Sequence, residues 1–311
     1  AVVELAECCG ITLLPLDADG RSALAPLTAS SRGVGDAIAA ALDSGARRVT
    51  LALGGSASTD AGFGALSALG LRALDDTGDE LEPGGAALEH LATIDTTTVR
   101  SPPPDSMMLL TDTTAVLCGP NGAAVVFGPQ KGAGPELVSQ LNQALAQAAA
   151  VSSTLLPSPD RPWLAAIDRG SYLQPGSGAA GGTAWAFLRF WGASIQSGAE
   201  TIGTLTGLDA ALEGADLVIT GEGRFDATSL AGKVVGAIVE RASVAGVPVA
   251  VVAGQADLAL DESGGVDVEA AGLEHVLTLT DLAGSSEAAV GEPDRWLRAA
   301  GAKLARRATR R

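Results

Sequence analysis

The segment ADLVITGEGRFDATSLAGKVVGAIVERASVAGVPVAVVAG, residues 215–254, contains the pattern that indicates the fold class most clearly. It begins with the apolar run 217–220 and ends with a second apolar run at 247–252, and both are typical of buried strands. Between them, valine and isoleucine recur at helical spacing over 234–239, and Gly246 is placed to end that helix. Strand, helix and strand predict a right-handed βαβ unit in a parallel sheet.

A glycine-rich segment with three charged residues follows the first of these strands, which is expected to end before Gly221. Open parallel sheets bind ligands beyond the carboxyl ends of their strands, so this segment is a candidate site. Glycine allows backbone N–H groups to approach an anion, and Arg224 is suited to neutralising phosphate. The carboxylate of Glu222 or Asp226 is suited to holding Mg²⁺ or orienting a hydroxyl group. A tight turn with a solvated salt bridge is the alternative interpretation.

A second strand, glycine loop and helix occur earlier in the chain. The apolar run 49–53 leads into GGSASTDAG at 54–62, and a helix is expected over 62–69. Three hydroxyl groups and the carboxylate of Asp60 make this loop a candidate phosphate site. The same residue types are also ordinary helix-capping residues, so ligand binding and capping are both open.

Three further segments carry candidate features. Ser30 or Ser31 is expected to cap a helix that runs through Ala41. The segment 118–132 is rich in glycine and proline and holds Lys131, which favours a role facing a ligand. GSGAAGG at 176–182 is either a helix N-terminus that binds an anion or a point of close helix packing, and the aromatic residues after it are expected in the core.

Composition narrows the class of protein. The chain has 311 residues, which favours two domains. Its 36 acidic and 20 basic residues give a net charge of −16, which argues against nucleic acid as a partner. Three cysteines and two histidines have no disulfide or zinc spacing, and no apolar run is long enough to span a bilayer. We therefore expect a cytoplasmic protein without a membrane or nucleic-acid partner.

Taken together, the motifs resemble those of the bacterial glycerate kinases of the two-domain type. The matching segments are SSRGVG, ALGGSASTDAG, LCGPNGAAVVFGPQKGA, GSGAAGG and LVITGEGRFD followed by GK, and they occur in the same order as in that family. The resemblance covers nearly the whole chain. It implies an α/β fold with two domains and mainly parallel sheets, one domain being Rossmann- or flavodoxin-like and inserted in the other. The expected boundaries are 1–195 for the inserted domain and 196–311 for the C-terminal part of the other.

The resemblance also implies an activity, namely ATP- and Mg²⁺-dependent phosphorylation of D-glycerate to 2- or 3-phosphoglycerate, and it leaves a homo-oligomer open. A small-molecule substrate is thus the expected partner. The residues carried over by position are Asp226, Glu222, Arg224 and Asp112 for catalysis, with Asp226 and Asp112 as Mg²⁺ ligands; Ser31 and Arg32 for the glycerate carboxylate; and Gly54, Gly55, Ser56, Asp60 and Lys131 for the nucleotide phosphates.

The sequence departs from the family pattern at several positions. Thr59 and Ala61 replace asparagine and glycine, the segment after Asp112 lacks an Asn-Pro pair, and Ala231 replaces a frequent histidine. Residues 1–10 are expected to form an amphipathic helix, and the family's segments before that helix are expected to be missing from this chain. Two alternatives therefore stay open: a ligand-binding relative without activity, and a kinase for another small hydroxy acid.

Overall fold

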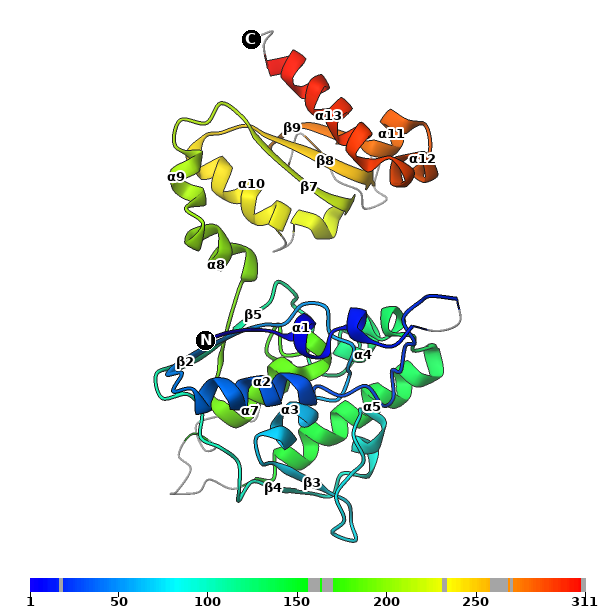
Figure 1. Ribbon diagram of the computed structural model, residues 1–311, viewed down its shortest axis with the longest axis vertical. Coiled ribbons are helices and arrows are strands. Elements are labelled where there is room, and N and C mark those ends of the chain that lie inside the picture. Colours follow the sequence, from blue (N-terminus) through cyan, green and yellow to red (C-terminus); the bar gives the residue numbers. More distant parts are fainter. Residues whose placement is uncertain are drawn as a thin grey trace. The chain divides into compact units, whose positions relative to one another are not determined.

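The computed structural model describes residues 1–16, 19–155, 163, 170–230, 234–257, 268 and 271–308. The chain divides into two compact units, Ala1–Gly198 and Ala199–Arg311. Figure 1 shows both units.

The first unit is built on a sheet of four parallel strands in the order β1-β2-β5-β6. The two central strands alternate between buried and less buried residues, with Val49, Leu51, Met107 and Leu109 on the buried side. This is the period of two that a half-buried strand requires. A two-stranded antiparallel ribbon completes the unit. The strands are β1 (Val2–Glu4), β2 (Arg48–Ala52), β5 (Ser106–Leu110) and β6 (Ser194–Gln196) in the sheet, and β3 (Arg72–Leu74) and β4 (Thr93–Asp95) in the ribbon.

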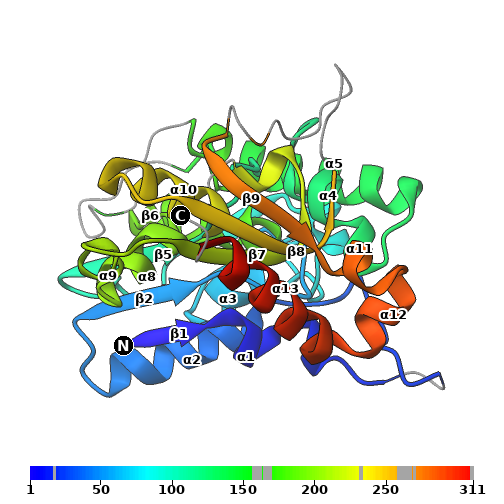
Figure 2. The same cartoon turned by 90° about the horizontal axis from the view of Figure 1, so that it is seen from above.

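Helices pack against this sheet, among them α2 (Arg32–Asp43), which runs alongside β1 and β2 (Figure 2). The α-helices of the first unit are α1 (Leu5–Cys9), α2 (Arg32–Asp43), α3 (Phe63–Ala68), α4 (Ala123–Phe127), α5 (Pro135–Ser152) and α7 (Thr183–Trp191). Short 3₁₀ helices are η1 (Ile11–Leu13), η2 (Ala86–His90), η3 (Pro129–Lys131), η4 (Ser171–Leu173) and η5 (Ala179–Gly182). The whole of α7 is buried, including its aromatic residues. Phe187, Phe190 and Trp191 therefore lie in the core, as the sequence predicts.

The first ten residues differ from the single helix that the sequence predicts. Val2–Glu4 form β1, which pairs in parallel with β2, and only Leu5–Cys9 are helical. Pairing with a strand nearly fifty residues away decides the conformation here, and local helical periodicity carries no information about such a partner.

The second unit contains a sheet of three parallel strands in the order β7-β8-β9. Its strands are β7 (Val218–Phe225), β8 (Val249–Ala256) and β9 (Leu273–Thr278). The expected end of the first strand before Gly221 is wrong, because β7 continues to Phe225 and its last residues pair with β8. Both strands need glycine for close approach. A Cβ on Gly221 would lie 2.2 Å from the Val252 carbonyl oxygen, and one on Gly254 would lie 2.5 Å from that of Gly223.

Helices cover both faces of this second sheet (Figure 1). Val249 and Val251 pack in a cluster with Val235 and Ala242 of α10, whereas Ala250 packs in another with residues of α11, α12 and α13. The helices are α8 (Gly198–Leu205), α9 (Leu208–Leu212), α10 (Val234–Ala245), α11 (Leu279–Ala283), α12 (Ser286–Gly291) and α13 (Pro293–Ala308), with the 3₁₀ helix η6 (Ala227–Leu230). Strand, helix and parallel strand thus follow one another over β7, α10 and β8, as predicted.

The predicted fold class, an α/β protein with mainly parallel sheets, is confirmed. The insertion of one domain in the other stays a prediction, as do the expected boundaries. Within the described residues, no helix is both long and apolar enough to cross a bilayer. The segment 157–169 lies outside the described residues, except for Trp163.

Candidate active site

A candidate site of the first unit is a large cavity of about 400 Å³ beside the residues that follow β2 and β5. Gly54, Gly55 and Ser56 come after β2 and line it, and Lys131 at the end of η3 lines it as well. These are four of the five residues predicted to contact phosphate. Its lining in the described part of the chain is Ile11, Leu53, Gly54, Gly55, Ser56, Thr111, Thr113, Phe127, Gln130, Lys131, Ala179 and Ala180. Lys131 is the single charged residue in that set.

The side chain of Lys131 is nearly inaccessible to solvent, and two hydrogen bonds fix its amine. Its residue is 3% exposed, and its Nζ donates hydrogen bonds to Ser56 Oγ at 2.8 Å and to the Ser58 carbonyl oxygen at 2.5 Å. Burial lowers the pKa of Lys131 to about 8, although the charge of Asp60 and then that of Cys9 act in the opposite direction. An anion in the cavity would favour the charged form of this amine, so the site is suited to phosphate.

This buried amine predicts a pH dependence of stability. Between pH 8 and about 10.5 the unfolded chain holds a proton on Lys131 that the folded chain has lost, so the contribution of this residue to folding becomes more favourable as pH rises. We expect the free energy of unfolding of the wild type to rise relative to that of Lys131→Met by on the order of 2 kcal/mol across this range. Urea unfolding of both proteins at pH 7 to 10 measures it.

The comparison with Lys131→Met is needed because Cys9 acts in the opposite direction. Burial, with the charge of Asp60, raises the pKa of its thiol to about 12, so folding keeps a proton there that the unfolded chain releases near pH 9. Both proteins contain Cys9, and most of its effect cancels in the difference. A difference that stays flat from pH 7 to 10 would contradict the lowered pKa of Lys131.

Asp60 and Ser31 are bonded to each other inside the protein. The Asp60 carboxylate accepts hydrogen bonds from the backbone N–H and the hydroxyl of Ser31, at 2.8 and 2.9 Å, and from the backbone N–H groups of Gly62 and Gly64. Ser31 Oγ in turn accepts from the backbone N–H of Ala65. Both residues are at most 1% exposed. Their side chains therefore join the start of α2 to the start of α3, and direct contact of either with a ligand stays a prediction.

The sequence predicts that Ser30 or Ser31 caps the helix that became α2, but the side chain of Ser31 does not cap it. No side chain caps α2 at Ser31, because that hydroxyl is used by Asp60 and Ala65. The neighbouring Ser30 Oγ accepts a hydrogen bond from the backbone N–H of Arg32 at 3.2 Å, which meets part of the helix's need for acceptors.

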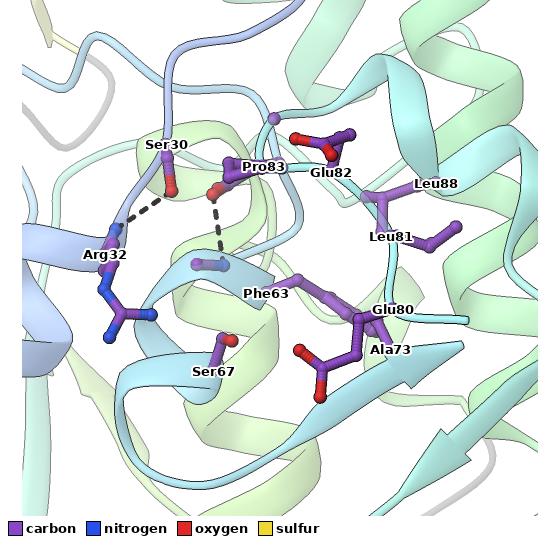
Figure 3. A pocket seen from close by; sticks show the side chains of 13 residues that line it. Ser30, Arg32, Phe63, Ser67, Ala73, Glu80, Leu81, Glu82, Pro83 and Leu88 are labelled. Atoms are coloured by element: carbon purple, nitrogen blue, oxygen red, sulfur yellow. Dashed lines mark hydrogen bonds between the residues drawn. The ribbon is translucent and has the colours of Figure 1, made fainter. Parts of the chain in front are cut away.

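Arg32 lines a second, smaller hollow of about 70 Å³ (Figure 3). Its guanidinium lies on the wall of that hollow near Ser30 and Ser67, and its side chain is 59% exposed. The ion pair between Arg32 and Asp36 is loose, with Nε and Oδ2 3.9 Å apart. An exposed, loosely paired arginine keeps its donors available for a carboxylate. Glu80 and Glu82 also line the hollow, and Glu80 is paired with Arg72.

The GSGAAGG segment serves close packing, which was one of its two interpretations. A Cβ on Gly181 would lie 2.2 Å from the Ser58 carbonyl oxygen, and one on Gly182 would lie 2.7 Å from the Cα of Ala61. Both glycines have positive φ, as does Ala61, and the Ala61 N–H donates to the Gly181 carbonyl. The segment thus supports the loop that carries Ser56 and Asp60.

Asp112 follows β5 and lies within the first unit. Its Oδ1 accepts a hydrogen bond from the hydroxyl of Ser197, the residue after β6, at 2.9 Å. Both flanking threonines, Thr111 and Thr113, line the large cavity. Asp112 is therefore beside the predicted phosphate site in sequence and at the same carboxyl edge of the sheet.

The remaining predicted residues belong to the second unit. Glu222 and Arg224 lie within β7, and Asp226 follows it. One buried carboxylate oxygen of Glu222, Oε1, has no hydrogen-bond partner among the described residues, which is the condition that a ligand or cation would relieve. The backbone N–H of Asp226 donates to Ser229 Oγ at 3.0 Å.

Arg224 is paired with Asp257 across the end of β8. Arg224 Nη2 and Asp257 Oδ2 are 2.6 Å apart, and this hydrogen bond raises the pKa of the guanidinium above its ordinary value. Both side chains are more than half exposed, at 63% and 57%. A surface pair of this kind contributes little to stability.

We therefore expect Asp257→Ala to leave the urea midpoint of unfolding unchanged. If Arg224 contacts a ligand, as predicted, Arg224→Ala lowers activity while Asp257→Ala does not. Equal losses of activity in the two variants would assign the pair a structural role instead. Unfolding curves and steady-state rates of both variants provide the measurement.

The predicted acidic site residues are chemically compatible with a divalent cation. No three His, Cys, Asp or Glu side chains in the described ranges gather into a metal cluster. Mg²⁺ in phosphoryl transfer is commonly held by one or two carboxylates together with substrate phosphates, so a dedicated cluster is not required. The carboxylates of Asp112 at the sheet edge and Glu222 with its unpartnered oxygen are the donor type that Mg²⁺ prefers.

A parallel sheet with a glycine loop and a buried lysine at its carboxyl edge defines an α/β protein with an anion site. The sequence profile of the glycerate kinase family matches residues 1–309. The chain belongs to the glycerate kinase family.

Individual relatives agree with this assignment. The chain is 37% identical to the glycerate kinase of Bacillus subtilis (strain 168) over 255 residues, 82% of this chain and 63% of the relative. It is 38% identical to the glycerate 2-kinase of Escherichia coli (strain K12) over 235 residues, 75% of this chain and 58% of the relative. A crystal structure described as glycerate kinase 2 from Salmonella typhimurium LT2 has a TM-score of 0.64 and 34% identity, with 89% of this chain and 66% of that chain covered. The chain thus spans less than two thirds of these relatives.

Proposed function

We propose that this protein transfers the γ-phosphoryl group of ATP to D-glycerate, giving 2- or 3-phosphoglycerate. Its membership of the glycerate kinase family supports the class of reaction. The observation that carries the proposal is the buried amine of Lys131, the one charged group among the described residues of a cavity lined by Gly54, Gly55 and Ser56. Phosphoryl transfer requires mainly positioning and neutralisation of charge, and this arrangement supplies both.

The chain's own residues have separate tasks in this proposal. Lys131 neutralises phosphate, and the loop at Gly54 and Gly55 lets backbone groups approach it. Arg32, with its exposed guanidinium, binds the carboxylate of glycerate. Asp60 and Ser31 hold the two segments that carry these groups in register through their mutual hydrogen bonds.

The second unit supplies acidic groups. Asp226 would accept the proton of the attacking hydroxyl or hold Mg²⁺, and Glu222 of the same unit would provide another carboxylate for the ion. Asp112 of the first unit stays a predicted Mg²⁺ ligand. When bound, Mg²⁺ neutralises charge on the phosphate oxygens during transfer.

The direct test is release of ADP by the 311-residue chain with ATP, Mg²⁺ and D-glycerate. We expect ADP formation to depend on glycerate, and ³¹P spectra of the product to assign the phosphorylated carbon. A folded chain that binds ATP and glycerate without turnover would contradict the kinase proposal and indicate a ligand-binding relative. Faster turnover with tartronate or lactate than with glycerate would instead indicate a kinase for another hydroxy acid.

A further inference from the structure

Phe127 differs from the other phenylalanines of the chain. Of five phenylalanines, Phe63, Phe187 and Phe190 belong to the core of the first unit and Phe225 to the core of the second. Phe127 joins none of the hydrophobic clusters of the described residues, and it lines the large cavity. A large apolar ring is normally placed in a core, so its position on a cavity wall points to a ligand.

The segment that carries Phe127 also carries the phosphate-binding amine. Phe127 is the last residue of α4, and the adjoining 3₁₀ turn η3 ends at Lys131. Backbone hydrogen bonds connect α4 to η3: the Gly128 N–H donates to the Ala124 carbonyl, and the Lys131 N–H donates to the Gly128 carbonyl. Because Lys131 Nζ is bonded to Ser56 and Ser58, the turn that positions the ring is fixed against the glycine loop.

The other residues of α4 differ in how far they are exposed to solvent. Ala123 and Ala124 are fully buried in the core, whereas Val125 and Val126 are 39% and 47% exposed. Phe127 is half-buried and lines the cavity. Ile11 lines the cavity as well, and it also joins no hydrophobic cluster of the described residues. The cavity therefore has apolar walls as well as the polar ones of the glycine loop and Lys131.

A cavity with both kinds of wall fits a ligand that has an anionic part and a planar apolar part. Its volume of about 400 Å³ is several times larger than a three-carbon acid needs and is in the range of sites for larger ligands. Aromatic rings stack on the faces of nucleobases. Gln130 also lines the cavity, and its amide both donates and accepts hydrogen bonds, as the edge of a base requires.

We infer that this cavity binds a nucleoside triphosphate with its base against the ring of Phe127 and its phosphates at Lys131 and the glycine loop. The inference rests on the proposed function in that ATP is the phosphoryl donor there. The inference adds Phe127 as a residue that determines the affinity for the base.

The experiment compares two ligands that share their phosphates and differ in the base. Isothermal titration calorimetry measures binding of ATP and of inorganic tripolyphosphate, each with Mg²⁺, to the full chain and its variants. We expect Phe127→Ala to weaken ATP binding about tenfold and to leave tripolyphosphate binding unchanged. Lys131→Met weakens both ligands, and Val126→Ala, an exposed neighbour on the same helix, weakens neither.

Two further variants keep a large side chain at position 127, so they separate the loss of the aromatic ring from the empty space that Phe127→Ala leaves. Phe127→Trp keeps an aromatic face and is expected to retain ATP binding, whereas Phe127→Leu keeps an apolar side chain without that face and is expected to lose affinity for ATP alone. Equal weakening of both ligands by Phe127→Ala, or no change in either, would overturn the inference, as would a folded wild type that does not bind ATP. If the pattern holds but ADP release does not depend on glycerate, the kinase proposal alone fails.

Discussion

Replacing Lys131 with methionine is expected to lower kcat/KM for glycerate phosphorylation by about 10²–10³-fold. The reason is that Lys131 is the one positive charge among the described residues that line the large cavity, and nothing else in that lining can neutralise phosphate. A donor already fixed by Ser56 Oγ and the Ser58 carbonyl loses little by reorganisation when charge develops in the transition state. Steady-state kinetics with ATP and glycerate varied separately provide the measurement.

Methionine is the appropriate substitute because it has a similar length and no charge. Removing a buried amine also removes its desolvation cost, so we expect the variant to fold and its urea midpoint to confirm this. Lys303→Met, on α13 of the second unit, is the control for loss of one positive charge. A Lys131→Met protein with wild-type folding and less than a threefold loss of kcat/KM would exclude Lys131 from phosphate binding.

Asp226→Asn is expected to lower kcat by about 10²–10⁴-fold, with ATP affinity changed little. The residue follows β7 at the carboxyl edge of the second sheet, where parallel sheets place reacting groups. Asparagine keeps the size of the side chain and removes its capacity to accept a proton or to attract Mg²⁺. Single-turnover rates, together with ATP titrations, separate the chemical step from binding.

Raising the Mg²⁺ concentration distinguishes the two tasks proposed for Asp226. Partial recovery of kcat in Asp226→Asn assigns the residue to the metal, and no recovery assigns it to the proton. Glu287→Gln, an exposed acid at the start of α12, is the control for loss of a negative charge from the same unit. Unchanged turnover in a folded Asp226→Asn protein would remove this residue from the mechanism.

The candidate site was predictable to different degrees from the sequence. Gly54, Gly55 and Ser56 follow an apolar run and were expected at the end of a strand, and β2 does end just before them. Lys131 was weak as a candidate on its own, since most lysines are exposed, and only its burial and its two hydrogen bonds distinguish it. Phe127 lies in the segment 118–132 that the sequence predicts to face a ligand, but nothing in the sequence distinguishes its ring from that of a core residue.

The pair formed by Ser31 and Asp60 shows a different limit. Each residue was a candidate for its own reason, the first as a cap or substrate contact and the second as a phosphate contact. Their hydrogen bond joins residues 29 apart in sequence, and it uses the hydroxyl that a local cap would have needed. Local hydrogen-bonding preference does not predict which distant partner competes for a group.

The class of fold and several of its elements follow from the sequence alone. Hydrophobic period, glycine placement and turn residues act within a few positions, so the pattern over 215–254 specified a strand, a helix and a parallel strand, and the loop at 54–62 was expected at a strand end. Other features depend on tertiary contacts: residues 2–4 form a strand, β7 continues through its glycines, and Lys131 reaches Ser56 across 75 positions. Phe127, moreover, joins none of the hydrophobic clusters of the described residues. These outcomes depend on pairing, burial and close packing between segments far apart in the chain, and such contacts exist only once the chain has folded.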